Sequence, residues 1–360
     1  MLAVLCMVVL PRFTAVARAA EISGLYQAAV PVVSREDERE RQQAFVAAMR
    51  QILVKLSGRT DTLEHPDVLR ALGMVQTYVE AWAYRSLPPE PATAAAPASA
   101  PGAVLEVSFF ESQLQGLLDT AGIPLWPASR PDTLLWIVEQ DAAGQRSLLG
   151  PENPVFVSLQ ALAADRAMPL ISPILDLQDR MALRPDVLWE LDPAAIVGAS
   201  SRYQTDSVLV LRIMRLVSGE VIARAEHHLR GLVQQVEMLE TPLEPFLDAS
   251  IDLAARELAS NYGVFVSGVA DAAIQVSLTV HGIDSLEDYA GVLRYLEGLA
   301  VVKSVELTSA SGSTLVFDVS TGGQLRQLIE TLALERWVQA LGDPVRDGQI
   351  FNLDYQWQGP

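Results

Sequence analysis

The sequence is almost devoid of cysteine: its 360 residues include one, Cys6, within an apolar run close to the N-terminus. If the first twenty residues are removed from the mature protein, no cysteine remains. Disulfide bonds, thiolate catalysis and cysteine-ligated zinc or iron–sulfur sites would then be excluded together.

Basic residues are also scarce. Lys and Arg number 26 against 44 Asp and Glu, which gives a formal net charge of −18. Binding to the phosphate backbone of a nucleic acid depends on clustered Lys and Arg, so we expect no nucleic-acid partner. Solubility explains this charge most simply, and attraction of a cationic partner is the alternative.

Recognised catalytic and cofactor motifs are missing as well. The chain has four histidines but no HExxH spacing, no Gly-x-Ser-x-Gly turn and no glycine-rich phosphate loop. His227 and His228 are adjacent on a predicted strand, so their side chains should leave opposite faces and cannot share a metal ion. We therefore predict no catalytic residue, no metal site and no cofactor, which favours a protein that is not an enzyme.

The first twenty residues, 1–20, are predicted to be a signal peptide. Leu2 to Leu10 is apolar but far shorter than the ~20 residues of a spanning helix, and Ala17-Arg18-Ala19 fits a signal-peptidase site. We expect a periplasmic protein with no integral membrane span after signal cleavage. Because no Lys or Arg precedes the run and Pro11 interrupts it, an uncleaved anchor is the alternative.

A long amphipathic helix is predicted between Ser34 and Arg59. Its apolar residues recur at the spacing of one buried face, and they are Ala44, Phe45, Ala48, Met49, Ile52, Leu53 and Leu56. Ser34 and Asp37 are placed as a capping box, and Gly58 should end the helix. The strand-like run from Leu25 to Val33 is its expected partner, so the fold should open with a strand and a helix over a sheet.

Two structural units are predicted, which makes the fold class α/β (α+β) and multi-domain. Helices and strands alternate through residues 22–263, as in an α/β body with a mixed sheet. Residues 274–357 follow the order βαββαβ, the pattern of a ferredoxin-like C-terminal domain.

A Pro/Ala-rich tract, PPEPATAAAPASAPG at residues 88–102, has nothing to bury and should be disordered. Strand-like runs flank it at Val79–Leu87 and Val104–Phe110. Two such runs most simply pair with each other, so a hairpin loop is favoured over an interdomain linker.

The order of several sequence blocks resembles a secreted proteobacterial family, domain of unknown function 2066. The blocks are LYQAAVPV, RQQAFVAAMRQILVKLSGRTD, AGIPLWPASRPDTLLWIVEQD, PLISPILDLQD and SRYQTDSVLVLRI. The resemblance implies an exported protein with an α/β body, no assigned activity and no catalytic residues to carry over. The length of the Pro/Ala-rich tract departs from the family.

Three side chains are candidates for a ligand site. Asp176 and Asp179 follow a strand-like run at its C-terminal end, where α/β sheets place ligand sites, and could hold a cation or act as acid and base. Arg130 lies between two tryptophans in the sequence and could clamp an anion between aromatic walls. Solvated acids and a structural salt bridge are the simpler explanations.

Two functions are compatible with these patterns. The first is a non-catalytic periplasmic or envelope-associated protein that binds an envelope protein partner through its sheet edges or its C-terminal domain. The alternative is a small-molecule or cation-binding protein, or a hydrolase, that uses the acids after the strand 169–175 together with Arg130. Clustering of Arg130, Asp176 and Asp179 around one pocket would favour the alternative.

Overall fold

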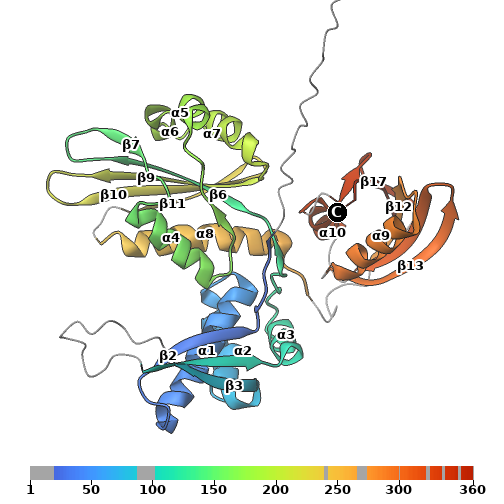
Figure 1. The fold of residues 1–360 in the computed structure, drawn as a ribbon, viewed down its shortest axis with the longest axis horizontal. Helices are drawn as coiled ribbons and strands as arrows, with labels where there is room; N and C mark the ends of the chain where they lie inside the picture. The colour runs from blue at the N-terminus through green and yellow to red at the C-terminus, as the bar shows by residue number, and fades with distance from the viewer. Residues whose placement is uncertain are drawn as a thin grey trace, which may run out of the picture.

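Mixed helices and sheets make up the chain, as predicted for an α+β protein of several units (Figure 1). The computed structural model describes residues 20–86, 102–238, 242–265, 274–299, 301–321, 325–334, 337–347 and 350–359. The predicted signal peptide, apart from Ala20, and most of the Pro/Ala-rich tract lie outside the described residues. Among the described residues, none of the helices has the length and apolar character needed to cross a lipid bilayer.

The N-terminal unit is a three-stranded antiparallel sheet with the long helix α1 (Glu38–Ser57) packed on one face. The strand order is β2-β4-β3, with β2 at Gln27–Val32, β3 at Val79–Ser86 and β4 at Ala103–Phe109. Its core is completed by α2 (Pro66–Leu72), α3 (Glu111–Thr120) and the short 3-10 helices Asp61–Glu64 and Val75–Thr77. Because β3 and β4 pair antiparallel, the predicted hairpin is confirmed.

The buried face of α1 is the predicted one, since all seven apolar residues of the stripe are buried. Its N-terminal cap differs from the prediction. Asp37 caps the helix by accepting from the N–H groups of Arg39 and Glu40, whereas Ser34 lies in the preceding turn. Gly58 ends the helix as predicted, with φ at +66°. A Cβ there would come within 2.7 Å of Ala259, so only glycine allows this close approach.

A six-stranded mixed sheet forms the central unit, in the order β11-β10-β9-β6-β7, with β8 beside β6. The strands are β6 (Thr133–Gln140), β7 (Arg146–Leu148), β8 (Leu170–Ile171), β9 (Ser207–Arg215), β10 (Val221–Leu229) and β11 (Leu232–Met238). One face packs against α4 (Pro154–Asp165) and α8 (Glu244–Tyr262). The other packs against α6 (Pro185–Trp189) and α7 (Pro193–Ser200), which a 3-10 turn at Ser201–Tyr203 follows. Helix α5 (Leu177–Ala182) lies beside α7.

The predicted body, residues 22–263, therefore contains two sheets. The opening strand and helix belong to the antiparallel sheet, and the mixed sheet follows. The strand predicted at 169–175 shrinks to β8, because Pro173 has no N–H for a ladder and Leu175 is left-handed at φ +55°. A short antiparallel pair, β1 (Ala20–Glu21) with β5 (Ser129–Arg130), links the start of the chain to the loop before β6.

The C-terminal unit begins as predicted but ends differently. Its elements are β12 (Ile274–His281), α9 (Leu286–Gly298), β13 (Val302–Ser311), β14 (Thr314–Thr321), α10 (Leu325–Leu334), β15 (Val338–Ala340), β16 (Val345–Asp347) and β17 (Ile350–Trp357). A single strand after α10 would run opposite to β12. In this structure β15 and β16 run in that opposite direction, and the chain then turns back, so β17 runs parallel to β12. The strand order of the sheet is β13-β14-β12-β17-β15, with β16 beside β17. The sheet thus departs from the expected βαββαβ ferredoxin-like ending.

Helix α10 joins the C-terminal unit to the rest of the protein. Leu334 packs against the core of the central unit, and the side-chain amide of Gln327 donates to the carbonyl of Gly263. Arg230, in the turn between β10 and β11, forms an ion pair with Glu330 of α10 at 3.2 Å. The three units are therefore in direct contact with one another through α8, α10 and the end of α1.

Candidate functional site

Arg130 is fully buried and serves as a structural tie. A guanidinium has five N–H groups, and all five donate to backbone carbonyls, at 2.7–3.0 Å, of Lys55, Trp126, Pro127, Arg166 and Ala167. The group also stacks on the Trp126 ring. Burial lowers the pKa of Arg130 to about 9, so it remains protonated at neutral pH. The predicted anion clamp is wrong because no donor is left for an anion, and the simpler prediction of a salt bridge is replaced by bonds to carbonyls.

Asp176 and Asp179 are also engaged internally. Asp176 caps α5 by accepting from the N–H of Asp179, and it accepts from Arg202 at 2.9 Å. Asp179 is buried and accepts from the N–H of Leu175, from Arg202 and from the hydroxyl of Tyr203. The Arg202 hydrogen bond lowers the pKa of Asp176 to about 2, and burial raises that of Tyr203 to about 12. Arg202 thus occupies the place that a cation would take.

The three predicted site residues do not meet. The partners of Arg130 come from α1, the loop before β5 and the end of α4, whereas the two acids bond within α5 and to the turn after α7. Within the described part of the chain, no group of three or more His, Cys, Asp or Glu side chains is arranged to hold a metal ion. The arrangement expected for a binding site or hydrolase built from these residues is absent.

A buried hydrogen-bonded chain was not anticipated from the sequence. The hydroxyls of Thr133 and Ser207 lie 2.8 Å apart, Ser207 Oγ is 2.9 Å from His227 Nε2, and His227 Nδ1 is 2.6 Å from Glu257. A hydroxyl, an imidazole and a carboxylate in this order form the triad of many hydrolases. Ser207 and His227 are, however, completely inaccessible to solvent, so no substrate can approach the hydroxyl. The chain satisfies polar groups inside the core.

Strand pairing explains why sequence reasoning missed this chain. Ser207 lies opposite Thr133 in the parallel β6–β9 pair, and Glu257 comes from α8, so the partners are far apart in sequence. The prediction that His227 and His228 leave opposite faces is confirmed: His227 reaches α8, and His228 lies on the other side, 3.3 Å from Glu226. An inward-pointing histidine in an apolar strand was the only local signal.

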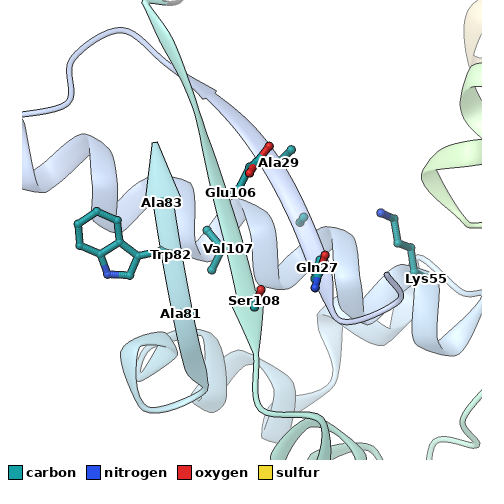
Figure 2. Close-up of a pocket in the computed structure, with 10 residues that line it drawn as sticks. Gln27, Ala29, Lys55, Ala81, Trp82, Ala83, Glu106, Val107 and Ser108 are labelled. Atoms are coloured by element: carbon teal, nitrogen blue, oxygen red, sulfur yellow. The ribbon is translucent and has the colours of Figure 1, made fainter. Parts of the chain in front are cut away.

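The open face of the N-terminal sheet carries an accessible hollow of about 480 Å³. Figure 2 shows it across β2, β4 and β3, on the opposite side of the sheet from the α1 core. Small side chains form its floor, and polar side chains surround it; the residues are Ala29, Ala81, Ala83 and Ser108, then Gln27, Lys55 and Glu106. Such a floor lets another chain approach the backbone closely.

The strand that borders this hollow lies at the edge of its sheet. β3 pairs with β4 on one side, and within the described residues no strand pairs with its other side. Pro, charged side chains such as Lys, and β-bulges protect such edges in many proteins. The opposite edge strand β2 contains Pro31, whereas β3 has a register shift between Val79 and Ala81 and charged residues at Glu80 and Arg85, which leaves Ala81–Tyr84 without Pro, charge or bulge. Trp82 on β3 is 46% exposed and contacts Phe45 and Arg41 of α1. Backbone groups and an aromatic side chain are therefore available together at this edge.

Comparison with known proteins shows that a family model matches the N-terminal unit. The family described as "Domain of unknown function (DUF8605)" matches residues 19–127, which corrects the resemblance to domain of unknown function 2066. No curated protein matches the chain. A solved structure, the competence or damage-inducible protein from Enterobacter asburiae, is similar over 36% of this chain and 86% of its own, with 14% identity and a TM-score of 0.22. The family match spans the whole three-stranded sheet, the hollow included.

Proposed function

We propose that this is an exported, non-catalytic protein of the cell envelope that binds an extended segment of a partner protein along β3. The observation that carries the proposal is that the edge strand β3 has no partner strand on its outer side within the described residues and lies beside a hollow lined by small residues. Addition of a strand to an exposed sheet edge is a recurring mode of peptide recognition, in which main-chain hydrogen bonds supply affinity and alternate side chains supply specificity.

The two faces of β3 would contact different side chains of such a segment. Side chains of an added strand alternate between faces, so one set would lie beside Ala81 and Ala83 at the hollow, where there is room. The other set would lie beside Trp82, whose exposed ring offers apolar contact. This geometry favours a partner with small or flexible polar residues on one face and apolar residues on the other.

The alternative function receives no support from the described residues. The polar groups of Arg130, Asp176 and Asp179 are hydrogen-bonded within the protein, and Ser207 is inaccessible to a substrate. The periplasm remains the proposed compartment, on the strength of the signal-like residues 1–20. Cell fractionation and N-terminal sequencing of the mature protein test it: we expect a periplasmic protein that begins close to Ala20, and a cytosolic protein that retains Met1 would contradict export.

Site-specific crosslinking tests the binding surface. A photo-reactive residue at position 83 on β3 should capture a defined partner from envelope extract, whereas one at Ser309, on the edge strand β13 of the C-terminal unit, should not. Ala83→Lys, which fills the hollow from an exposed position, should abolish partner recovery, and Ser309→Lys should leave it unchanged. Capture from position 309 alone, or full recovery with Ala83→Lys, would show that β3 is not the binding edge.

A further inference from the structure

The side chains of β3 match those required of a strand that pairs with β3. Such a strand needs small side chains beside the hollow and apolar ones beside Trp82. In β3 itself, Ala81 and Ala83 lie on the hollow face. Trp82 and Tyr84 lie on the α1 face, where their ring centroids are 5.5 Å apart, and in Figure 2 the Trp82 ring projects past β3 on the side away from β4. β3 is therefore suited to pair with a copy of itself.

Opposite charges at the two ends of residues 81–84 favour one direction of such pairing. Glu80 precedes this stretch, Arg85 follows it, and both are exposed. In an antiparallel pair the Glu80 end of one copy meets the Arg85 end of the other, whereas a parallel pair in register sets like charges side by side. Arg85 also pairs with Glu106 at 2.6 Å within the chain, and a guanidinium has donors left for a second carboxylate.

Two-fold symmetry limits which residues of the two strands face each other. The axis of an antiparallel pair stands perpendicular to the sheet, so both copies keep the same face toward the hollow, and opposed residues come from one face. An axis at Ala83 places this residue opposite its own copy and Ala81 opposite Arg85 on the hollow face. On the α1 face it places Trp82 opposite Tyr84 twice, and cross-strand aromatic pairs of this kind stabilise a sheet.

We propose that β3 binds β3 of a second copy of this chain, antiparallel and centred on Ala83, so that the two N-terminal sheets become continuous. This inference rests on the proposed function, because it names the partner of the same edge. The paired stretch is short, so the dimer should be reversible and depend on protein concentration. The net charge of −18 on each copy does not prevent it, since at about 0.15 M salt charges are screened beyond about 8 Å.

Disulfide trapping tests the register. The mature protein expected to begin near Ala20 has no cysteine, so one introduced thiol can react only with its own copy. Opposed residues of an antiparallel pair have Cα atoms about 4.5–5.5 Å apart, within reach of a disulfide. With oxidised glutathione, Ala83→Cys should therefore give a disulfide-linked dimer. Ala81→Cys is the matched control on the same face: it lies about 13 Å along the strand from its own copy and should stay uncrosslinked.

Sedimentation velocity measures the association itself. The unaltered mature protein should shift from monomer towards dimer as its concentration rises from about 1 to 100 μM. Ala83→Lys should weaken the dimer about tenfold or more, because two ammonium groups would meet at the axis, and Ser309→Lys on β13 should leave it unchanged. A protein that stays monomeric over this range, or that dimerises equally well with Ala83→Lys, would overturn the proposal, as would equal crosslinking of Ala83→Cys and Ala81→Cys.

The photo-reactive residue at position 83 separates this proposal from the proposed function. A crosslinked product of twice the protein's mass that contains only this chain would support both. Capture of a different envelope protein by a chain that is monomeric in sedimentation would overturn the dimer and leave partner binding along β3 intact. No capture at position 83, together with a monomer, would refute both.

Discussion

Arg130 donates every N–H of its guanidinium to carbonyls of three separate chain segments, so its removal should loosen the junction between the N-terminal and central units. Arg130→Met leaves buried carbonyls without donors, and we expect a loss of at least about 3 kcal/mol in the free energy of unfolding. Arg130→Lys should recover only part of this, because an ammonium cannot reach five acceptors in one plane.

Urea denaturation of these variants measures the loss, with Arg39→Met as a control at an exposed position of α1. The control should change stability by less than about 0.5 kcal/mol. Equal, small shifts of the midpoint in Arg130→Met and Arg39→Met would refute the structural role.

Asp176 leads to a prediction about acid stability. Its pKa falls to about 2 in the folded protein, chiefly through the hydrogen bond from Arg202, and an unfolded Asp titrates near about 3.9. The unfolded state therefore binds more protons between these values, so the contribution of Asp176 is complete above pH ~4 and is lost as the pH falls towards 2. Asp176→Asn keeps a capping side chain but loses the charge. The difference in melting temperature between the two proteins should shrink over that range; a constant difference would contradict this account.

Residue type alone identified Arg130, Asp176 and Asp179 as unusual, and each is indeed in a dense polar environment. What the sequence could not supply was the partner of each group. An arginine among aromatic residues can bind an anion or donate to buried carbonyls. Which of the two it does depends on how α1 and α4 pack around it. The same applies to Ser207, whose contact with His227 depends on the register of β9 and β10.

At the scale of elements, α1 organises the N-terminal unit. Leu53 is fully buried on its apolar stripe, so Leu53→Ala should cost roughly 2–5 kcal/mol through lost burial and the cavity left behind. Gln43→Ala, at an exposed position of the same helix, should cost less than about 0.5 kcal/mol. Denaturant midpoints of the two variants provide the measurement, and similar small shifts in both would mean that α1 is not a core helix.

Long periodic elements were predictable, and short ones were not. The stripe of α1 repeats over several turns, so this helix emerged from the sequence within a few residues of its ends. α5 and α6 span six and five residues, too few for a helical period to show, and the segment was interpreted as a loop with acids. That interpretation missed that Asp179 points into the protein, while Leu177, two residues earlier, is exposed.

At the scale of the whole molecule, the proposed binding edge and the C-terminal unit are separate features. The β3 edge and its hollow are on the N-terminal sheet. The C-terminal unit contacts the others through α10 and through Val264, which follows α8, packs in the C-terminal core and pairs with Leu125. The rest of that core comes from the unit's own residues, so weakening the α10 contact should loosen the unit without unfolding it.

The Arg230–Glu330 pair is the charged part of that contact. Glu330 is nearly buried, Arg230 is about one-third exposed and lies over the Tyr262 ring, and Gln327 adds a hydrogen bond one turn earlier on α10. Glu330→Ala with Gln327→Ala should weaken docking by about 1–3 kcal/mol, the usual cost of lost buried hydrogen bonds, and should leave the core of the C-terminal unit intact. Small-angle scattering should then show a larger radius of gyration, while near-ultraviolet circular dichroism from Trp337 and Trp357 stays unchanged. Glu297→Ala, on the exposed side of α9, is the control and should alter neither signal. An unchanged radius in the double variant would mean that apolar packing, such as that of Leu334, fixes the domain without help from the ion pair.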